Sequence, residues 1–177
     1  MILVDWQIKQ KIELKEVVID PFNPELINPS SLDVRLGNVF SWTTATPITG
    51  IVDPLDPSTF KTRTETRDIY LLGPGQMVLG CLMETITLPN NISVEIKGKS
   101  SLGRLFLSNS HWAGWVDPGW SGVITLELRN DSYFPIRLTT GMKIGQLLFY
   151  EHNSCARPYS KTGRYHNQDP GSGSKGI

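Results

Sequence analysis

Residues 113–129 read Ala-Gly-Trp-Val-Asp-Pro-Gly-Trp-Ser-Gly-Val-Ile-Thr-Leu-Glu-Leu-Arg, a tight turn followed by an alternating strand. Asp117-Pro118-Gly119 is typical of a turn, because proline fixes its own φ and glycine accepts positive φ. Apolar and polar residues then alternate through 124–129 with a period of two, which predicts a β-strand over 123–129 with one buried face. Glu127 falls on the opposite face of that strand.

The same punctuation recurs along the rest of the chain, where 16 glycines and 12 prolines separate short apolar runs. Many short strands with turns between them are typical of a sandwich, jelly roll or barrel. We therefore predict a mainly β fold, a distorted β-barrel or jelly-roll-like core with one or two short helices. The expected strands are 31–36, 68–72, 76–83, 92–97, 123–129, 136–138 and 146–150, and the expected helices are 5–15 and 100–107.

The bulk composition narrows the possible partners. The chain has 177 residues, enough for one domain with a core, and its formal net charge is zero. A neutral chain has no global basic field to recruit nucleic acid, so an anionic ligand needs a local cluster of cations. No apolar run approaches the roughly 18 residues of a membrane span, and the N-terminus lacks the features of a signal peptide. We expect a cytoplasmic protein with neither a nucleic-acid nor a membrane partner.

The segment Gly98-Lys99-Ser100-Ser101-Leu102-Gly103-Arg104 offers two hydroxyls, two cations and glycines that permit close backbone approach. These are the components of a phosphate cradle. The segment is not a Walker A loop, because Ser93 stands where that motif needs a glycine. A plain Gly/Ser turn between strands is the competing interpretation.

Glu127 and the turn before it also allow two interpretations. Glu127 could lie in solvent beside Arg129, or it could lie in a ligand pocket and transfer protons there. Small residues in 113–122 would let a ligand approach the backbone, although Asp117 could simply cap its own turn.

Zinc chemistry is not expected. Zinc-dependent deaminases need the motifs His-x-Glu and Pro-Cys-x-x-Cys, and neither occurs in this sequence. The histidines His111, His152 and His166 are scattered, and Cys81 and Cys155 are far apart. We expect no zinc site and two free thiols.

Residues 156–177 differ in composition from the rest. This segment has four cations against one acid, few large apolar residues, and a Gly/Ser-rich end. It is either a disordered tail or a basic lid that orders over a phosphate ligand. Tyr159 and Tyr165, interleaved with the cations, favour the lid. We therefore divide the chain into a catalytic domain, 1–155, and a lid, 156–177.

Five motifs in order resemble the dCTP deaminase family of the dCTP deaminase/dUTPase superfamily, over nearly the whole chain as far as Gln168. They are Asn28-Pro29-Ser30-Ser31-Leu32-Asp33-Val34-Arg35-Leu36-Gly37, the segment 98–104, the segment 113–127, Gly141-Met142-Lys143-Ile144-Gly145-Gln146, and the tail with Arg157-Pro158-Tyr159, Arg164-Tyr165 and Gln168. The resemblance implies a dUTPase-type fold, a homotrimer with sites between subunits, and zinc-independent deamination of dCTP to dUTP with Mg²⁺ held through the triphosphate.

The resemblance also implies roles for particular residues. Glu127 matches the general acid/base that activates water at cytosine C4, and the backbone of Ala113 and Gly114 matches the base site. The substrate and phosphate contacts would be Lys99, Ser100, Ser101, Arg104, Asp117, Thr125, Tyr159, Arg164 and Gln168.

One departure from the family pattern bears on regulation, and a second feature bears on the product. Ser110-His111-Trp112 stands where many members have His-x-Thr, a stretch linked in the family with inhibition by dTTP, so dTTP inhibition is an open question here. Ala113-Gly114-Trp115-Val116-Asp117 looks more like the bifunctional members that convert dCTP to dUMP. Two further hypotheses are a dUTPase acting on dUTP and a nucleotide-binding regulator without turnover.

Overall fold

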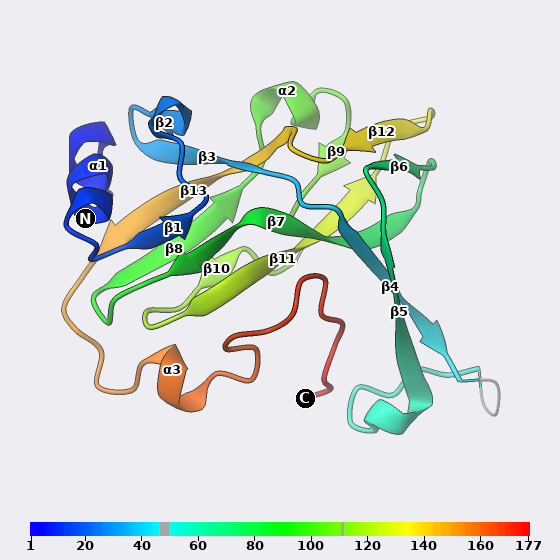
Figure 1. Cartoon of the computed structure of the whole chain (residues 1–177). Coiled ribbons are helices and arrows are strands. Elements are labelled where there is room, and N and C mark those ends of the chain that lie inside the picture. Colours follow the sequence, from blue (N-terminus) through cyan, green and yellow to red (C-terminus); the bar gives the residue numbers. More distant parts are fainter. Residues whose placement is uncertain (47–49, 111) are drawn as a thin grey trace.

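The computed structural model describes residues 1–46, 50–110 and 112–177, and most of its ordered elements are strands of two sheets (Figure 1). The six-stranded sheet has the order β5 (Phe60–Thr66), β4 (Val39–Ala45), β7 (Met77–Thr87), β11 (Ser121–Asn130) and β9 (Leu107–Ser108), with β1 (Val18–Asp20) paired to β7. The five-stranded sheet has the order β10 (Trp115–Val116), β8 (Ile92–Lys97), β13 (Lys143–Glu151), β3 (Ser31–Arg35) and β2 (Ile27–Asn28).

Smaller elements complete the fold. A two-stranded sheet pairs β12 (Ile136–Thr139) with β6 (Ile69–Leu72). The helices are α1 (Asp5–Glu13), α2 (Ser100–Gly103) and α3 (Tyr159–Thr162), with short 3₁₀ turns η1 (Pro24–Leu26) and η2 (Pro57–Thr59). In the described chain, no helix is long and apolar enough to cross a membrane.

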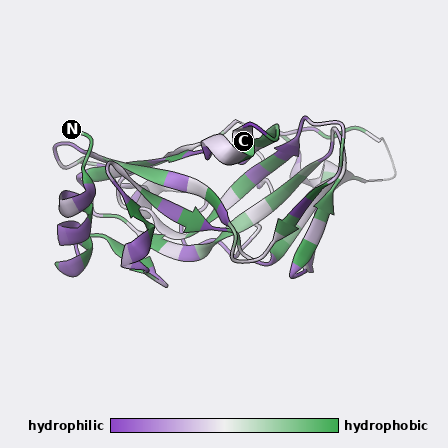
Figure 2. Ribbon diagram, turned by 90° about the horizontal axis from the view of Figure 1, so that it is seen from above, coloured by the Kyte–Doolittle hydropathy of each residue, from purple (hydrophilic) through white to green (hydrophobic). Residues whose placement is uncertain are grey.

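One hydrophobic core joins the sheets. Every second residue of β11 is buried, so Leu126 and Leu128 enter the core beside Phe149 of β13 and Phe40 of β4. Hydrophobic and hydrophilic residues alternate along the strands in Figure 2, as a sheet with one covered face requires. The core therefore fixes the opposite face of β11, which carries Glu127, toward the outside of the sandwich.

The prediction of a mainly β fold is confirmed, but the helices differ from the prediction. There are three α-helices among the described residues, where we expected one or two. The first ends at Glu13 instead of residue 15, since Lys15 adopts a φ of 58°. The second ends at Gly103 instead of residue 107, because Phe106 has a φ of 59° and Leu107 pairs with β11.

The hairpin β4–β5 was not predicted. Seven residues of each strand pair, from Val39 opposite Thr66 to Ala45 opposite Phe60. Threonine recurs in both strands and alternates with charged residues in β5, so apolar alternation does not mark them, although threonine favours strands. Figure 1 shows the hairpin projecting beyond the sandwich, at its lower right.

The C-terminal tail, 156–177, lies against the six-stranded sheet. The N–H of Asn167 donates to the carbonyl of Ser121 at the start of β11, and the N–H of Ile177 donates to the carbonyl of Pro54. Figure 1 shows the tail running below β11 from α3 toward the β4–β5 hairpin. The tail therefore covers part of the outer face of β11.

Candidate active site

A cavity of about 690 Å³ lies between the outer face of β11, the segment 112–120 and the tail. Its walls are rich in aromatic rings, which suit a planar ligand. The aromatic residues that line it are Trp42, Trp112, Trp115, Trp120, Tyr159 and Tyr165. The predicted site residues that line it are Ala113, Asp117, Thr125, Glu127, Tyr159 and Gln168.

Glu127 lies in this cavity. One carboxylate oxygen, Oε2, accepts hydrogen bonds from the N–H groups of Trp112, at 2.6 Å, and Ala113, at 3.0 Å. The backbone of Ser110 forms a parallel bridge with that of Glu127 and holds the same loop against β11. Arg129 pairs with Asp131, so the competing interpretation is not supported by an ion pair between Glu127 and Arg129 among the described residues.

The arrangement leaves half of the carboxylate available. Oε1 accepts no hydrogen bond from any of the described residues, while Oε2 is fixed by two peptide N–H groups. Such a carboxylate keeps one orientation and can still accept a proton from a ligand or water and return it.

Asp117 lies at the same cavity, at the turn before β11. The backbone closes this turn, because the N–H of Trp120 donates to the carbonyl of Asp117. The carboxylate accepts a hydrogen bond from the indole N–H of Trp115, at 3.2 Å. The side chain therefore does not cap its own turn but is oriented by a ring of the cavity wall.

Gly114 serves a packing role. Its carbonyl accepts the N–H of Ile96 on β8, at 2.7 Å, and a Cβ at this position would lie 3.0 Å from the carbonyl oxygen of Ile96. The neighbouring Ala113 lines the cavity, whereas Gly114 is outside the described lining. Gly114 thus lets the loop that holds Glu127 lie close to β8.

The tail contacts the site through two of its predicted residues. The side-chain N–H of Gln168 donates to the carbonyl of Val123 and to Thr125 Oγ1, at 3.0 and 3.3 Å. The ring of Tyr159 packs against Trp120 with centroids 5.2 Å apart. Arg164, by contrast, donates to the carbonyl of Gly176 within the tail itself and does not line the cavity.

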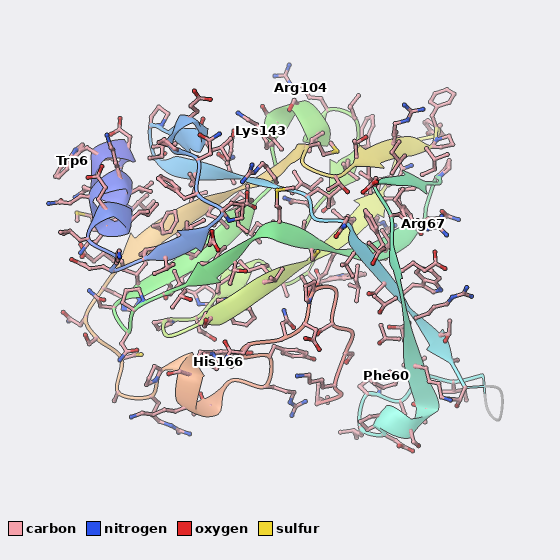
Figure 3. The ribbon with its side chains drawn as sticks, viewed as in Figure 1. Trp6, Phe60, Arg67, Arg104, Lys143 and His166 are labelled. Atoms are coloured by element: carbon pink, nitrogen blue, oxygen red, sulfur yellow. The ribbon has the colours of Figure 1, made fainter. Side chains whose placement is uncertain are left out.

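The predicted phosphate segment is not at this cavity. None of Lys99, Ser100, Ser101 and Arg104 is among the described residues that line it. Figure 3 shows Arg104 pointing away from the sheets at one side of the molecule, while His166 of the tail lies at the opposite side. One copy of the chain therefore does not bring the phosphate segment and the Glu127 cavity together.

No cluster of metal ligands accompanies the cavity. Among the described residues, no three or more His, Cys, Asp or Glu side chains gather to hold a metal ion. His111 lies outside the described residues. His152 is engaged with Ser93, at 2.9 Å, and both Cys81 and Cys155 are free thiols.

Three tryptophans of the aromatic wall, Trp42, Trp115 and Trp120, were not predicted as site residues. Trp42 comes from the β4–β5 hairpin, and Trp115 and Trp120 flank the Asp117 turn. A signal was present for the last two, since three of the five tryptophans fall within 112–120. Nothing in the local sequence of 39–45 connects Trp42 with that turn.

The fold and the cavity define a class: small β proteins with an aromatic cavity beside one oriented carboxylate. Comparison with known proteins identifies the class more closely. A protein-family model described as dCTP deaminase-like matches residues 2–152. The chain belongs to the dCTP deaminase-like family.

Similar proteins come from archaea and bacteria. A protein of Methanospirillum hungatei named "dCTP deaminase, dUMP-forming" is 48% identical over 172 residues, 95% of this chain and 92% of its relative. A protein of Pseudarthrobacter chlorophenolicus with the same name is 42% identical over 175 residues, 97% and 91% of the two chains.

Among solved structures, the 2'-deoxycytidine 5'-triphosphate deaminase of Agrobacterium tumefaciens has a TM-score of 0.64 at 23% identity. The match covers 84% of this chain but only 47% of that chain. At this identity the likeness establishes the shared fold.

Proposed function

We propose that this protein deaminates dCTP and releases the nucleotide product as dUMP. The observation that carries the proposal is Glu127, a carboxylate oriented by the N–H groups of Trp112 and Ala113 at an aromatic cavity. The names of the similar proteins support dUMP as the product. They favour the bifunctional reaction over simple release of dUTP, which the resemblance of the motifs alone made the leading prediction.

The reaction divides into two hydrolytic steps. In the first, Glu127 takes a proton from water as the water oxygen bonds to cytosine C4, and then returns it to the amino group, which leaves as ammonia. In the second, another water attacks the α-phosphorus, and the bond to the bridging oxygen breaks so that pyrophosphate leaves. The sum is dCTP plus two waters giving dUMP, ammonia and pyrophosphate.

The cavity provides contacts for the nucleoside half of the substrate. We assign the cytosine ring to the aromatic wall beside Glu127 and Ala113, and the deoxyribose to Asp117, whose carboxylate the indole of Trp115 orients. Thr125, two residues before Glu127 on the same face of β11, would complete the base side. This assignment leaves the triphosphate extending out of the cavity.

A second copy of the chain would supply the phosphate contacts. We propose a homotrimer in which Ser100, Ser101 and Arg104 of one subunit face the Glu127 cavity of another. In support, the large exposed apolar side chains beside this segment are suited to a subunit contact. They are Leu105, Phe106, Tyr133 and Phe134. Mg²⁺ bound with the nucleotide would neutralise part of the phosphate charge.

We assign 156–177 as the lid over this site and 1–155 as the catalytic domain. Gln168 already bridges the tail to Thr125, two residues from Glu127. Tyr159 and Arg164 would turn toward the ligand when it binds. Closing the tail over the cavity would exclude bulk water and strengthen contacts to the phosphates.

The test is a direct assay of the purified protein with dCTP and Mg²⁺. Release of ammonia that persists in the presence of a zinc-selective chelator is expected, because Glu127 activates the water. No ammonia from dCTP together with hydrolysis of dUTP would identify a dUTPase. Tight dCTP binding without any product would identify a regulator, in which Trp112 restricts the pocket.

A further inference from the structure

Asp33 is a buried carboxylate that lies beside the predicted phosphate segment. Its side chain on β3 is only 2% exposed. Its Oδ1 accepts hydrogen bonds from Lys99, at 2.5 Å, and from the amide of Asn28, at 2.8 Å. Its Oδ2 lies 3.1 Å from the ammonium of Lys143. A carboxylate removed from water in this way depends on these donors for its charge.

A second contact holds the same segment at its backbone. The side-chain N–H of Gln146 on β13 donates to the carbonyl of Gly98, at 3.1 Å, and the hydroxyl of Ser31 donates to Gln146 Oε1, at 2.8 Å. The segment is thus fixed at two successive residues, through the Gly98 carbonyl and the Lys99 side chain. Both contacts are made by neighbouring strands of the five-stranded sheet, β3 and β13.

These contacts favour a structural role for Lys99 over a direct contact with substrate. The resemblance implies that Lys99 contacts substrate, yet its side chain is 23% exposed and its ammonium is directed at Asp33. Moving Lys99 to a phosphate would take one donor away from a buried carboxylate, which is unfavourable. Ser100 and Arg104 follow Lys99 in the chain and are exposed. Neither has to leave a buried carboxylate in order to contact a phosphate.

We infer that Asp33 is a positioning residue for triphosphate binding, and that Lys99 is the tether through which it acts. The Asp33–Lys99 pair and the Gln146–Gly98 contact hold the start of α2 in place. Ser100, Ser101 and Arg104 are then already arranged when a triphosphate arrives, so less ordering entropy opposes binding. The inference rests on the proposed function, since it names the part of that site that recognises phosphate.

The variant Asp33→Asn tests the inference, because it keeps the shape of the side chain and removes its charge. Glu84→Gln is the matched control. Glu84 is equally buried, with 2% side-chain exposure, but its hydrogen-bonding partner is Arg35, at 2.7 Å, and not a residue of 98–104. Three readouts are compared: amide hydrogen exchange of 98–104, calorimetric affinity for dCTP relative to deoxycytidine, and the separate values of KM and kcat.

For Asp33→Asn we expect faster exchange in 98–104 and an affinity for dCTP about tenfold weaker, the scale of one charge-assisted contact. Affinity for deoxycytidine should be unchanged, and the loss in turnover should appear in KM more than in kcat. Glu84→Gln should leave the exchange of 98–104, the relative affinity for dCTP and deoxycytidine, and the balance of KM and kcat unchanged. A general loss of stability would instead weaken nucleoside and nucleotide binding alike.

A double-mutant cycle separates a tether from a direct phosphate contact. If Lys99 acts through Asp33, Lys99→Met and Asp33→Asn should each weaken dCTP binding, and the double variant should be little worse than either. Additive losses would make Lys99 a phosphate contact and overturn the inference. Lys99→Met alone carries the test of segment exchange and dCTP affinity if Asp33→Asn does not fold.

The failure of this inference can be told from failure of the proposed function. If wild-type protein binds dCTP no better than deoxycytidine, both are contradicted. If wild type prefers dCTP and Asp33→Asn retains the whole preference with unchanged exchange in 98–104, the inference alone is wrong.

Discussion

At the scale of single residues, two backbone N–H groups orient Glu127. Its Oε2 is fixed by two consecutive peptide N–H groups, those of Trp112 and Ala113. Arg129, on the same face of β11, pairs with Asp131. A substitution that keeps the two hydrogen bonds can therefore separate proton transfer from structure.

Glu127→Gln should abolish deamination and leave dCTP binding largely intact. The carbonyl oxygen of glutamine can accept the same two N–H groups, but the amide cannot carry a proton, so kcat should fall by at least ~10²–10⁴-fold. Ammonia release at saturating dCTP and calorimetric affinity are the measurements, with Glu13→Gln on the exposed face of α1 as control. Normal turnover in the variant would remove Glu127 from the mechanism.

Arg104→Ala should weaken triphosphate binding with little effect on the fold. Arg104 is exposed just after α2, and a charge-assisted contact to phosphate contributes about 1.5–3 kcal/mol. The apparent affinity for dCTP should therefore drop, while thermal stability stays near that of wild type. An unchanged affinity would mean that Arg104 faces something other than the nucleotide.

Asp33 should make the protein sensitive to acid. Burial opposes ionisation of this carboxyl, but hydrogen bonds from Lys99, Lys143 and Asn28 outweigh burial and lower its pKa below 3.8. A lowered pKa gives stability that is present above about pH 4 and is lost as the pH falls through the folded-state value. When the pH is lowered experimentally from about 5 to about 2, the free energy of unfolding should fall more for wild type than for Asp33→Asn. The free energies of unfolding are measured by urea denaturation at each pH. Equal losses in wild type and Asp33→Asn would contradict this prediction.

The sequence allowed the placement of a residue relative to the core to be predicted where a strand alternates regularly. The period-two pattern predicted that Glu127 leaves the core, and the cavity contains it together with Asp117. The tether role of Lys99 could not be predicted, because its partner Asp33 and the supporting Gln146 are distant in sequence. Such pairings depend on how β3, β8 and β13 align, which no single window of sequence contains.

At the scale of elements, the tail is joined to the site mainly by polar contacts. Gln168 and Asn167 hydrogen-bond to β11, while Tyr159 and Tyr165 are the tail residues that pack against the core. Segments with few apolar anchors open at low cost in free energy. We therefore still predict that the tail, 156–177, is mobile without nucleotide and ordered when dCTP and Mg²⁺ are bound.

Truncation after Cys155 should leave a folded core that turns over poorly. The truncated chain keeps the strands β1 to β13 but loses the Gln168 bridge and the predicted lid contacts of Tyr159 and Arg164. Limited proteolysis of the full chain should show dCTP protecting the tail. Full activity of the truncated protein would make the tail a linker and nothing more.

The elements that sequence patterns missed were those formed by pairing rather than by apolar alternation. The β4–β5 hairpin is stabilised by a seven-residue register. The short strands β9 and β10 exist because β11 and β8 lie beside them. Interiors of long alternating strands such as β11 were predicted well, because burial of one face leaves its own pattern.

At the scale of the whole molecule, the proposed site is divided between two faces of one chain. Glu127 and Asp117 line the cavity between β11 and the tail. Arg104 directly follows α2 and lies on the far side of the molecule from the tail (Figure 3). A closed ring of identical subunits can bring two such faces together at every interface. The proposed trimer would therefore be required for catalysis and not only for stability.

Mixing two defective variants tests this requirement. Trimers assembled from Glu127→Gln and Arg104→Ala chains expressed together should recover activity, because about one quarter of the sites would combine an intact Glu127 with an intact Arg104. Either variant alone should be nearly inactive at low dCTP concentration. If the mixture stays at the level of its components, both residues act within one subunit or on different ligands.

The central claim is that this single protein converts dCTP to dUMP. Chromatography of the products over time tests this claim most directly. Purified protein incubated with dCTP and Mg²⁺ should yield ammonia, dUMP and pyrophosphate in equal amounts, with dUTP never accumulating. Accumulation of dUTP without pyrophosphate would reduce the activity to deamination alone. Unchanged dCTP after prolonged incubation would contradict the claim altogether.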